Sequence, residues 1–228
     1  VMGDPVSSVA YAIEAALRSL HGDLLLLLPA MGIVLGIIVL VSGNYHQLYA
    51  RFPEGGGDAA ATGRAFGEGW AFVPLGALMV DYTLTITISV AAGASAVIAY
   101  LPGLQSERVP LALVLLCLVA GLTWFGHGGR SIFGSMTIAF LLISTTVIVL
   151  GLIAPHAHGH APLHAHDRHW PPLAVLLAFP VAMALATGVE APSSAIAQLD
   201  QLDDAGRRCV GRIALWLMLT IVVWLTVG

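Results

Sequence analysis

Six long stretches of almost uninterrupted apolar residues constrain the fold of this chain more than any other feature of its sequence. A helix needs about 20 mostly apolar residues to cross the hydrocarbon layer of a membrane. Lipid offers the backbone no hydrogen-bond partner, so such segments must be helices or the strands of a closed barrel. The stretches are too long and too uniform for barrel strands, whose apolar residues alternate. The sequence therefore predicts an all-α, polytopic helical membrane protein with a single transmembrane domain over residues 1–228.

The positions of the apolar stretches give the expected helices. They run over residues 24–49, 70–101, 109–126, 132–154, 172–198 and 209–228, and a partial helix occupies residues 1–20. Only 10% of the residues are charged, whereas soluble domains carry about a quarter. The net charge of −4 is too small and too dispersed to indicate a nucleic-acid partner. The expected surroundings are the lipid bilayer of the plasma (inner) membrane, and the chain is expected to be cut at both ends.

The basic residues between the helices predict the orientation in the membrane. All nine are Arg, and one alternate set of connections holds six: Arg51, Arg64, Arg130, Arg207, Arg208 and Arg212. Short cytoplasmic connections are enriched in Arg and Lys, so we expect this set to be cytoplasmic. The run Gly55-Gly56-Gly57 in the first of these connections is expected to be a turn, because the sequence has no phosphate-loop pattern.

Two acidic residues, Asp81 and Glu190, interrupt apolar stretches. Intramembrane ionisable groups are costly and tend to mark ion or substrate paths. Asp81 is followed directly by Tyr82. Asp81, Thr85 and Ser89 are each four residues apart, so their three oxygen-bearing side chains lie on one face of the helix. Hard cations prefer such oxygen ligands. The alternative is that Thr85 and Ser89 bond back to their own helix while a neutral Asp81 packs against a neighbour.

Glu190 lies between Gly188 and Pro192 in the middle of its apolar stretch. Gly and Pro around an acid predict an interrupted helix with freed backbone carbonyls, which membranes tolerate only where the break faces protein or a wet cavity. A broken helix that carries an acid indicates a transport site. The alternative is a helix that is only kinked and contains a protonated Glu190.

A short pattern occurs twice. Asp4-Pro5-Val6-Ser7-Ser8 and Glu190-Ala191-Pro192-Ser193-Ser194 both read as an acid, two residues including a Pro, and then Ser-Ser. Broken helices in corresponding positions of two halves are typical of inverted-repeat transporters. The repeat therefore favours a transporter, although five residues are a short match.

These residues resemble the APC (amino acid, polyamine and organocation) superfamily, which has the LeuT-type five-plus-five inverted-repeat fold. The resemblance rests on four segments: residues 4–11, the loop 51–57, residues 81–85 with Ser89, and residues 187–191. Taken together they look most similar to the KimA-type potassium importers, which are similar to proton-coupled K⁺ symporters of the KUP group. The resemblance implies a LeuT-type bundle truncated to about its first seven helices.

The resemblance also implies roles for individual residues. The K⁺ path would be lined by Asp4, Tyr11, Asp81, Tyr82, Thr85, Ser89 and Thr187, and Glu190 would couple the proton. It implies no cofactor other than the transported K⁺ and H⁺, and a homodimer formed through C-terminal regions outside this sequence. One departure is Pro5, which replaces the small residue expected after the acid. The mechanism it implies is proton-coupled K⁺ import by alternating access.

Two other functions remain open. In an amino-acid permease, unwound segments around Gly3 and Gly188 would bind a substrate carboxylate and amine, although acids at both breaks fit a cation better. An intramembrane metalloenzyme is the remote alternative, since no helix carries HExxH or two His at helical spacing. The serines also have no His partner suited to nucleophilic catalysis. We therefore expect no enzyme and no catalytic residue.

One connection is rich in histidine. It contains His156, His158, His160, His164 and His166, which would bind Zn²⁺ or Ni²⁺ if they converged. Irregular spacing and flanking prolines favour a solvated loop instead. This metal site stays a subsidiary hypothesis.

Overall fold

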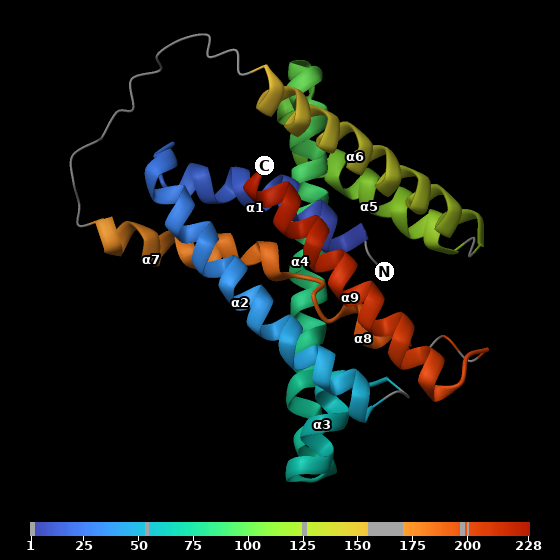
Figure 1. Ribbon diagram of the computed structural model, residues 1–228. Coiled ribbons are helices and arrows are strands. Elements are labelled where there is room, and N and C mark those ends of the chain that lie inside the picture. Colours follow the sequence, from blue (N-terminus) through green and yellow to red (C-terminus); the bar gives the residue numbers. More distant parts are fainter. Residues whose placement is uncertain (1–2, 53–54, 125–126, 155–170, 197–198, 200) are drawn as a thin grey trace.

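The computed structural model describes residues 3–52, 55–124, 127–154, 171–196, 199 and 201–228, and these are helical almost throughout (Figure 1). The α-helices are α1 (Gly3–Ser19), α2 (Leu24–Arg51), α3 (Gly57–Phe66), α4 (Phe72–Tyr100), α5 (Arg108–Trp124), α6 (His127–Ile153), α7 (Pro171–Ala182), α8 (Ala191–Ile196) and α9 (Asp204–Val227). Three short 3₁₀ helices connect them: η1 (Glu68–Ala71), η2 (Pro102–Glu107) and η3 (Met183–Ala186).

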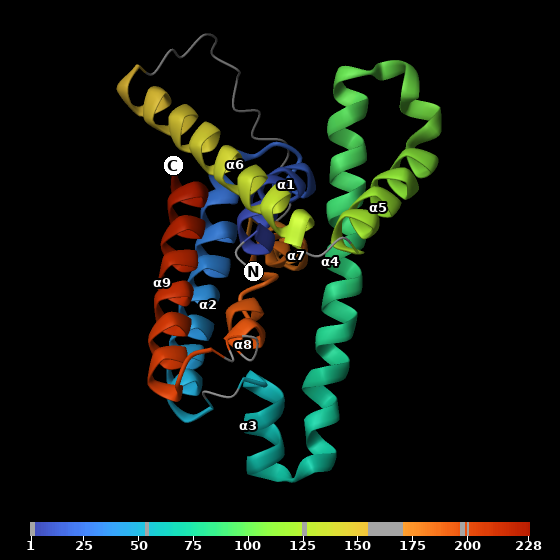
Figure 2. The ribbon, with the colours of Figure 1, turned by 90° about the vertical axis from the view of Figure 1, so that its right-hand side faces the viewer.

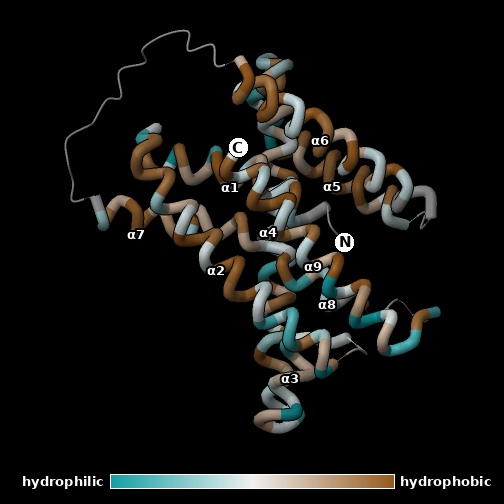
Figure 3. Tube along the Cα trace, in the orientation of Figure 1, coloured by the Kyte–Doolittle hydropathy of each residue, from teal (hydrophilic) through white to brown (hydrophobic). Residues whose placement is uncertain are grey.

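Six helical segments in this part of the chain are long and apolar enough to cross a membrane. They are Leu24–Arg51, Glu68–Tyr100, Pro102–Trp124, Ser131–Ile153, Pro172–Ser193 and Asp204–Val227. The protein is therefore an integral, multi-pass helical membrane protein. Hydrophilic residues gather around α3 and at the connection before α9 (Figure 3).

Polar caps determine where two of these helices begin. The side chain of Asp23 accepts hydrogen bonds from the backbone N–H groups of Leu25 and Leu26 at the start of α2. The side chain of Asp203 accepts one from Gly206, so α9 begins at Asp204 rather than at residue 209. The apolar run alone placed this start too late, because a capped first turn is polar.

One part of the molecule is a packed bundle, formed by α1, α2, α7 with η3, α8 and α9. Its core includes Ala12, Val34, Leu185, Leu215 and Met218, all of which are fully buried. Helices α2 and α9 lie side by side in both ribbon views (Figures 1 and 2). We call these elements the packed bundle.

The helices α4, α5 and α6 form a second part, which we call the exposed arm. Helices α4 and α5 pair with each other, and in Figure 2 this pair stands apart from α2 and α9. The buried residues of α4 are Thr85 and Ala94, and α5 has none. The arm meets the packed bundle through partly buried residues of α4 and α6, and Thr85 is one of the two residues buried on α4.

The chain leaves helical geometry between η3 and α8. Thr187 is extended, with φ of −62° and ψ of 141°, and Gly188 has φ of +79°. Glycine adopts this left-handed conformation without the steric cost that a Cβ imposes. The segment is thus a true interruption, and the alternative of a helix that is only kinked at Glu190 is wrong.

Candidate functional site

Helix α1 packs against η3, and this contact brings three hydroxyl groups together at the helix break. The Ser8 Oγ lies 2.7 Å from the Thr187 Oγ1 and 2.9 Å from the Tyr11 hydroxyl oxygen. The Tyr11 oxygen lies 3.5 Å from the Thr187 Oγ1. Thr187 also donates to the Ala184 carbonyl oxygen at 2.9 Å. Three side-chain oxygens thus converge beside a backbone that has left the helix.

Two of these residues, Tyr11 and Thr187, were predicted site residues, and the structure places them in contact. Ser8 was not among them, although it belongs to the repeated Ser-Ser pattern that the sequence contains twice. Asp4 lies in the first turn of α1, four residues before Ser8. The tertiary contact between α1 and η3 selects Ser8 over its neighbour Ser7, which is exposed.

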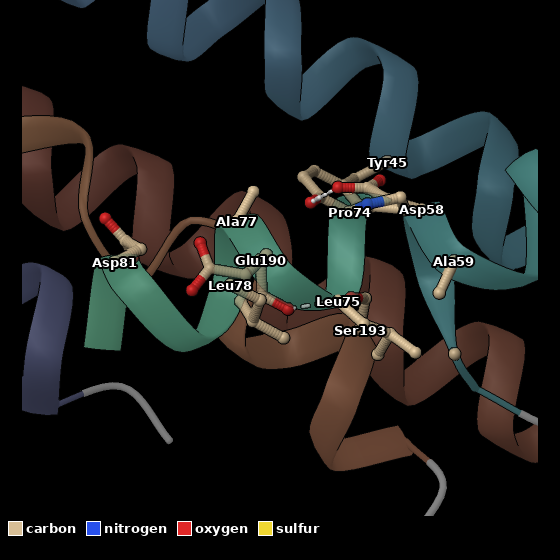
Figure 4. A pocket seen from close by; sticks show the side chains of 11 residues that line it. Tyr45, Asp58, Ala59, Pro74, Leu75, Ala77, Leu78, Asp81, Glu190 and Ser193 are labelled. Atoms are coloured by element: carbon tan, nitrogen blue, oxygen red, sulfur yellow. Dashed lines mark hydrogen bonds between the residues drawn. The ribbon is translucent and has the colours of Figure 1, made fainter. Parts of the chain in front are cut away.

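The two predicted intramembrane acids meet at one pocket. Its volume is about 310 Å³, and the lining residues are Tyr45, Gly56, Asp58, Ala59, Pro74, Leu75, Ala77, Leu78, Asp81, Glu190 and Ser193. They come from α2, α3 with the turn before it, α4, and the broken segment with α8 (Figure 4). Glu190 at the helix break and Asp81 of the exposed arm therefore line the same cavity, which is large enough for several molecules of the size of water.

On α4, Thr85 differs from the threonines beside it. Thr83 donates to the Met79 carbonyl oxygen and Thr87 donates to the Thr83 carbonyl oxygen, each at 2.8 Å. The Thr85 Oγ1 is buried and has no hydrogen-bond partner among the described residues. The alternative that Thr85 bonds back to its own helix is therefore wrong. A buried hydroxyl without a partner costs about 1–3 kcal/mol, and a ligand at this position would remove that cost.

The remaining residues of the α4 stripe are accessible only in part. Asp81, Tyr82 and Ser89 are half-buried. Asp81 lines the pocket, and Thr85 lies one helical turn farther along the same face. The stripe therefore leads from the pocket toward the buried contact between the exposed arm and the packed bundle.

The pocket also contains two residues that sequence reasoning missed, Tyr45 and Asp58. The Tyr45 hydroxyl donates to the Asp58 Oδ2 at 2.7 Å. Tyr45 lies in the polar run Asn44-Tyr45-His46 inside an otherwise apolar helix, and that run was the available signal. Asp58 gave no such signal, because an acid after a glycine turn is ordinary in a loop.

The glycine run before α3 is a turn, and it also permits a close approach between helices. Gly56 and Gly57 have φ of +83° and +38°. A Cβ on Gly57 would lie 2.7 Å from the Ser193 Oγ, which is closer than a side chain tolerates. The Ser193 Oγ in turn donates to the Glu190 carbonyl oxygen at 2.8 Å. The start of α3 thus rests directly on α8.

The histidine-rich connection lies outside the described residues, and with it His156, His158, His160, His164 and His166. Within the residues that the structure does describe, no group of three or more His, Cys, Asp or Glu side chains is placed to bind a metal. The zinc or nickel hypothesis therefore stays a prediction.

A broken helix in a membrane bundle, with two acids and a hydroxyl cluster around it, is the arrangement of a secondary transporter. A family model described as "Amino acid permease" matches residues 1–227. The chain belongs to the amino acid permease family, and the resemblance to the APC superfamily is confirmed. Its relatives are transporters.

A curated relative narrows the comparison further. The potassium transporter KimA of Bacillus subtilis (strain 168) is 30% identical to this chain over 205 residues. The match covers 85% of this chain and 34% of that protein, so the chain spans about a third of the length of the curated relative. No solved structure matches the chain significantly.

Proposed function

We propose that the protein is a secondary active transporter that imports K⁺ together with H⁺ by alternating access. The observation that carries the proposal is the buried Thr85 hydroxyl, which has no partner among the described residues and lies one turn from Asp81. Oxygen ligands with a nearby carboxylate suit a hard monovalent cation. The relative named a potassium transporter supports the choice of cation.

In this proposal the oxygens along α1, α4 and the helix break replace the hydration shell of K⁺. The path is lined by Asp4, Tyr11, Asp81, Tyr82, Thr85, Ser89 and Thr187. At the helix break the Thr187 hydroxyl lies beside backbone that has left the helix, and the Gly188 carbonyl oxygen accepts a hydrogen bond from the Ala191 N–H at 3.0 Å. Glu190 shares the pocket with Asp81 and exchanges the proton.

An amino-acid permease is the second candidate, and one observation favours it. The interruption at Gly188 leaves backbone groups that bind a substrate carboxylate in transporters with broken helices. Against it, Asp58, Asp81 and Glu190 all line the same pocket, and like charges at close range repel a carboxylate. The pocket therefore favours a cation.

The decisive experiment measures growth and K⁺ uptake in cells that lack their own potassium importers, with the gene expressed at two external pH values. Wild-type uptake should be faster at the lower external pH, because an inward proton gradient drives the symport. Asp81→Asn should abolish rescue at limiting K⁺. Glu190→Gln should abolish the pH dependence, because the amide cannot exchange a proton.

A pair of threonine variants provides a matched control. Thr85→Val removes a buried hydroxyl proposed to bind K⁺, and Thr83→Val removes an exposed hydroxyl that bonds its own helix. Losing one good ligand contact changes affinity about tenfold, so the K⁺ concentration for half-maximal uptake should rise about tenfold in Thr85→Val alone. Full rescue by Asp81→Asn, or equal effects of both threonine variants, would contradict the proposal and make labelled amino-acid uptake the next measurement.

A further inference from the structure

The hydrogen bond between Tyr45 and Asp58 joins the buried interior to the exposed surface. Tyr45 is 5% exposed, whereas Asp58 lies exposed in the first turn of α3. The bond is short, at 2.7 Å, and its acceptor is a carboxylate oxygen (Figure 4). Hydrogen bonds to ionised acceptors are roughly twice as strong as neutral ones. The pair therefore fastens α3 to α2 at the edge of the pocket.

Both residues also line the pocket that holds Asp81 and Glu190. Tyr45 and Asp58 lie on the α2 and α3 side of this pocket (Figure 4), and none of the three residues of the hydroxyl cluster is among its lining residues. The neighbouring Arg51 and Arg64 predict that this side is cytoplasmic. A ligand that left the pocket toward α3 would pass the pair.

Helix α3 touches the broken helix as well as α2. Gly57, its first residue, lies so close to Ser193 that a Cβ would collide with the Ser193 Oγ. Ser193 lies three residues after Glu190 and bonds its carbonyl oxygen. A displacement of α8 that follows a change at Glu190 would therefore push on the start of α3, where Asp58 is the next residue.

We propose that Tyr45 and Asp58 form a gate on the α3 side of the pocket, closed by their hydrogen bond and released when α8 moves. The two residues act as positioning residues: they hold α3 over the pocket and do not bind the transported ion. The inference rests on the proposed transport function, because a gate needs a cargo. It adds to that function the side on which the pocket opens and the contact that keeps it shut.

The test uses the rate at which a cysteine in the pocket reacts with a membrane-impermeant thiol reagent. The full gene product is prepared in inside-out vesicles, with every native cysteine, the exposed Cys117 and Cys209 among them, replaced by Ser and with Leu78→Cys as the reporter in the pocket lining. Tyr45→Phe deletes the hydrogen-bond donor. Because this destabilises the closed state alone, the population of the open state should rise, and the reaction rate with it, by about tenfold.

Tyr49→Phe is the matched control. Tyr49 lies one turn along α2, is as buried as Tyr45, and its ring centroid lies 6.3 Å from that of Tyr45. Its hydroxyl has no hydrogen-bond partner in the part of the chain that the structure describes. Removal of that hydroxyl should leave the reaction rate at the wild-type value.

Variants of the exposed partner keep the test valid if a buried tyrosine variant folds poorly. Asp58→Ala should match Tyr45→Phe, and the double variant should react no faster than either, because both changes delete one bond. Asp58→Asn keeps an acceptor but loses the charge, so its reaction rate should lie between those of the wild type and Asp58→Ala. Equal rates in Asp58→Ala and wild type, or the same acceleration in Tyr49→Phe, would overturn the gate.

The readout separates failure of the gate from failure of the proposed function. K⁺ should slow the reaction of the wild-type reporter, and a neutral amino acid should not. If Tyr45→Phe accelerates the reaction while K⁺ gives no protection, the gate stands and the K⁺ assignment fails. If K⁺ protects while neither Tyr45→Phe nor Asp58→Ala changes the rate, the transport proposal stands and the gate is wrong.

Discussion

The packed bundle and the exposed arm are both built from helices apolar enough to cross a membrane, yet they are buried to very different degrees. In the arm, the Ser131–Ile153 span has a mean hydropathy of 2.5 and none of its most apolar window is buried. In the bundle, the Asp204–Val227 span is less apolar, at 2.0, and 33% of its window is buried. Hydropathy therefore does not decide which helix packs inside the protein.

The physical reason is that lipid tails are as apolar as the side chains they surround. Helix association in a membrane depends on close packing and on interhelical hydrogen bonds rather than on escape from water. The bundle has both: Gly211 of α9 faces Ile196, and Ser8 of α1 bonds Thr187. The arm meets the bundle core through Ala92 of α4 and through Phe140, Leu141 and Ile148 of α6, all of which are only partly buried. Substitutions matched between the two regions test this account.

The largest effect is expected where two helix backbones approach each other. A side chain at Gly211 would overlap Ile196, which is buried, and would also meet the ring of Tyr49. Gly211→Leu should therefore destabilise the protein by about 3 kcal/mol, measured as a lower midpoint of thermal unfolding in detergent. Gly121→Leu on α5 meets open space, so its midpoint should stay within the error of the wild type. Equal losses in both would break the comparison.

A smaller effect is expected from a cavity. Leu215 of α9 is fully buried, whereas Leu142 of α6 is 65% exposed. Leu215→Ala should lower the free energy of unfolding by about 2 kcal/mol, the lower end of the range for buried leucines. The loss is small because in a membrane the side chain contributes packing, and its transfer from water does not contribute. Leu142→Ala should cost little by the same unfolding measurement. A cost at Leu142 that matched the cost at Leu215 would show that the arm is packed in the membrane.

The smallest effect on stability is expected at the hydroxyl cluster. Thr187→Val removes a donor to Ala184 and a partner of Ser8, and should cost about 1 kcal/mol. Thr146→Val on α6 removes an exposed hydroxyl that donates to the Leu142 carbonyl oxygen of its own helix, and should be neutral. The unfolding midpoints of the two variants check this. K⁺ uptake should fall in Thr187→Val and persist in Thr146→Val, and an unchanged uptake in Thr187→Val would remove Thr187 from the ion path.

Much of the fold could be read from local patterns in the chain. The apolar stretches predicted a polytopic helical protein, and Gly188 and Pro192 around Glu190 predicted the broken helix, because membrane insertion and helix geometry are properties of short segments. The spacing of Asp81, Thr85 and Ser89 put the three side chains on one face of α4 for the same reason, and their role in an ion path stays a prediction. The polar start of α9 was missed, since hydropathy does not report a capping side chain.

Long-range contacts could not be read in this way. Nothing local distinguishes Ser8 from Ser7, or shows that Asp58 accepts a bond from Tyr45 thirteen residues earlier in the chain. Those pairs depend on where α1 meets η3 and where the glycine turn meets α8. Each residue's preference for lipid and for the helical state follows from its own chemistry. The amino-acid sequence by itself therefore determined where the helices lie, where one of them breaks and which acids lie within the membrane. Only packing between distant helices decided which hydroxyls converge and which tyrosine borders the pocket, because such contacts depend on the shapes of both surfaces at once.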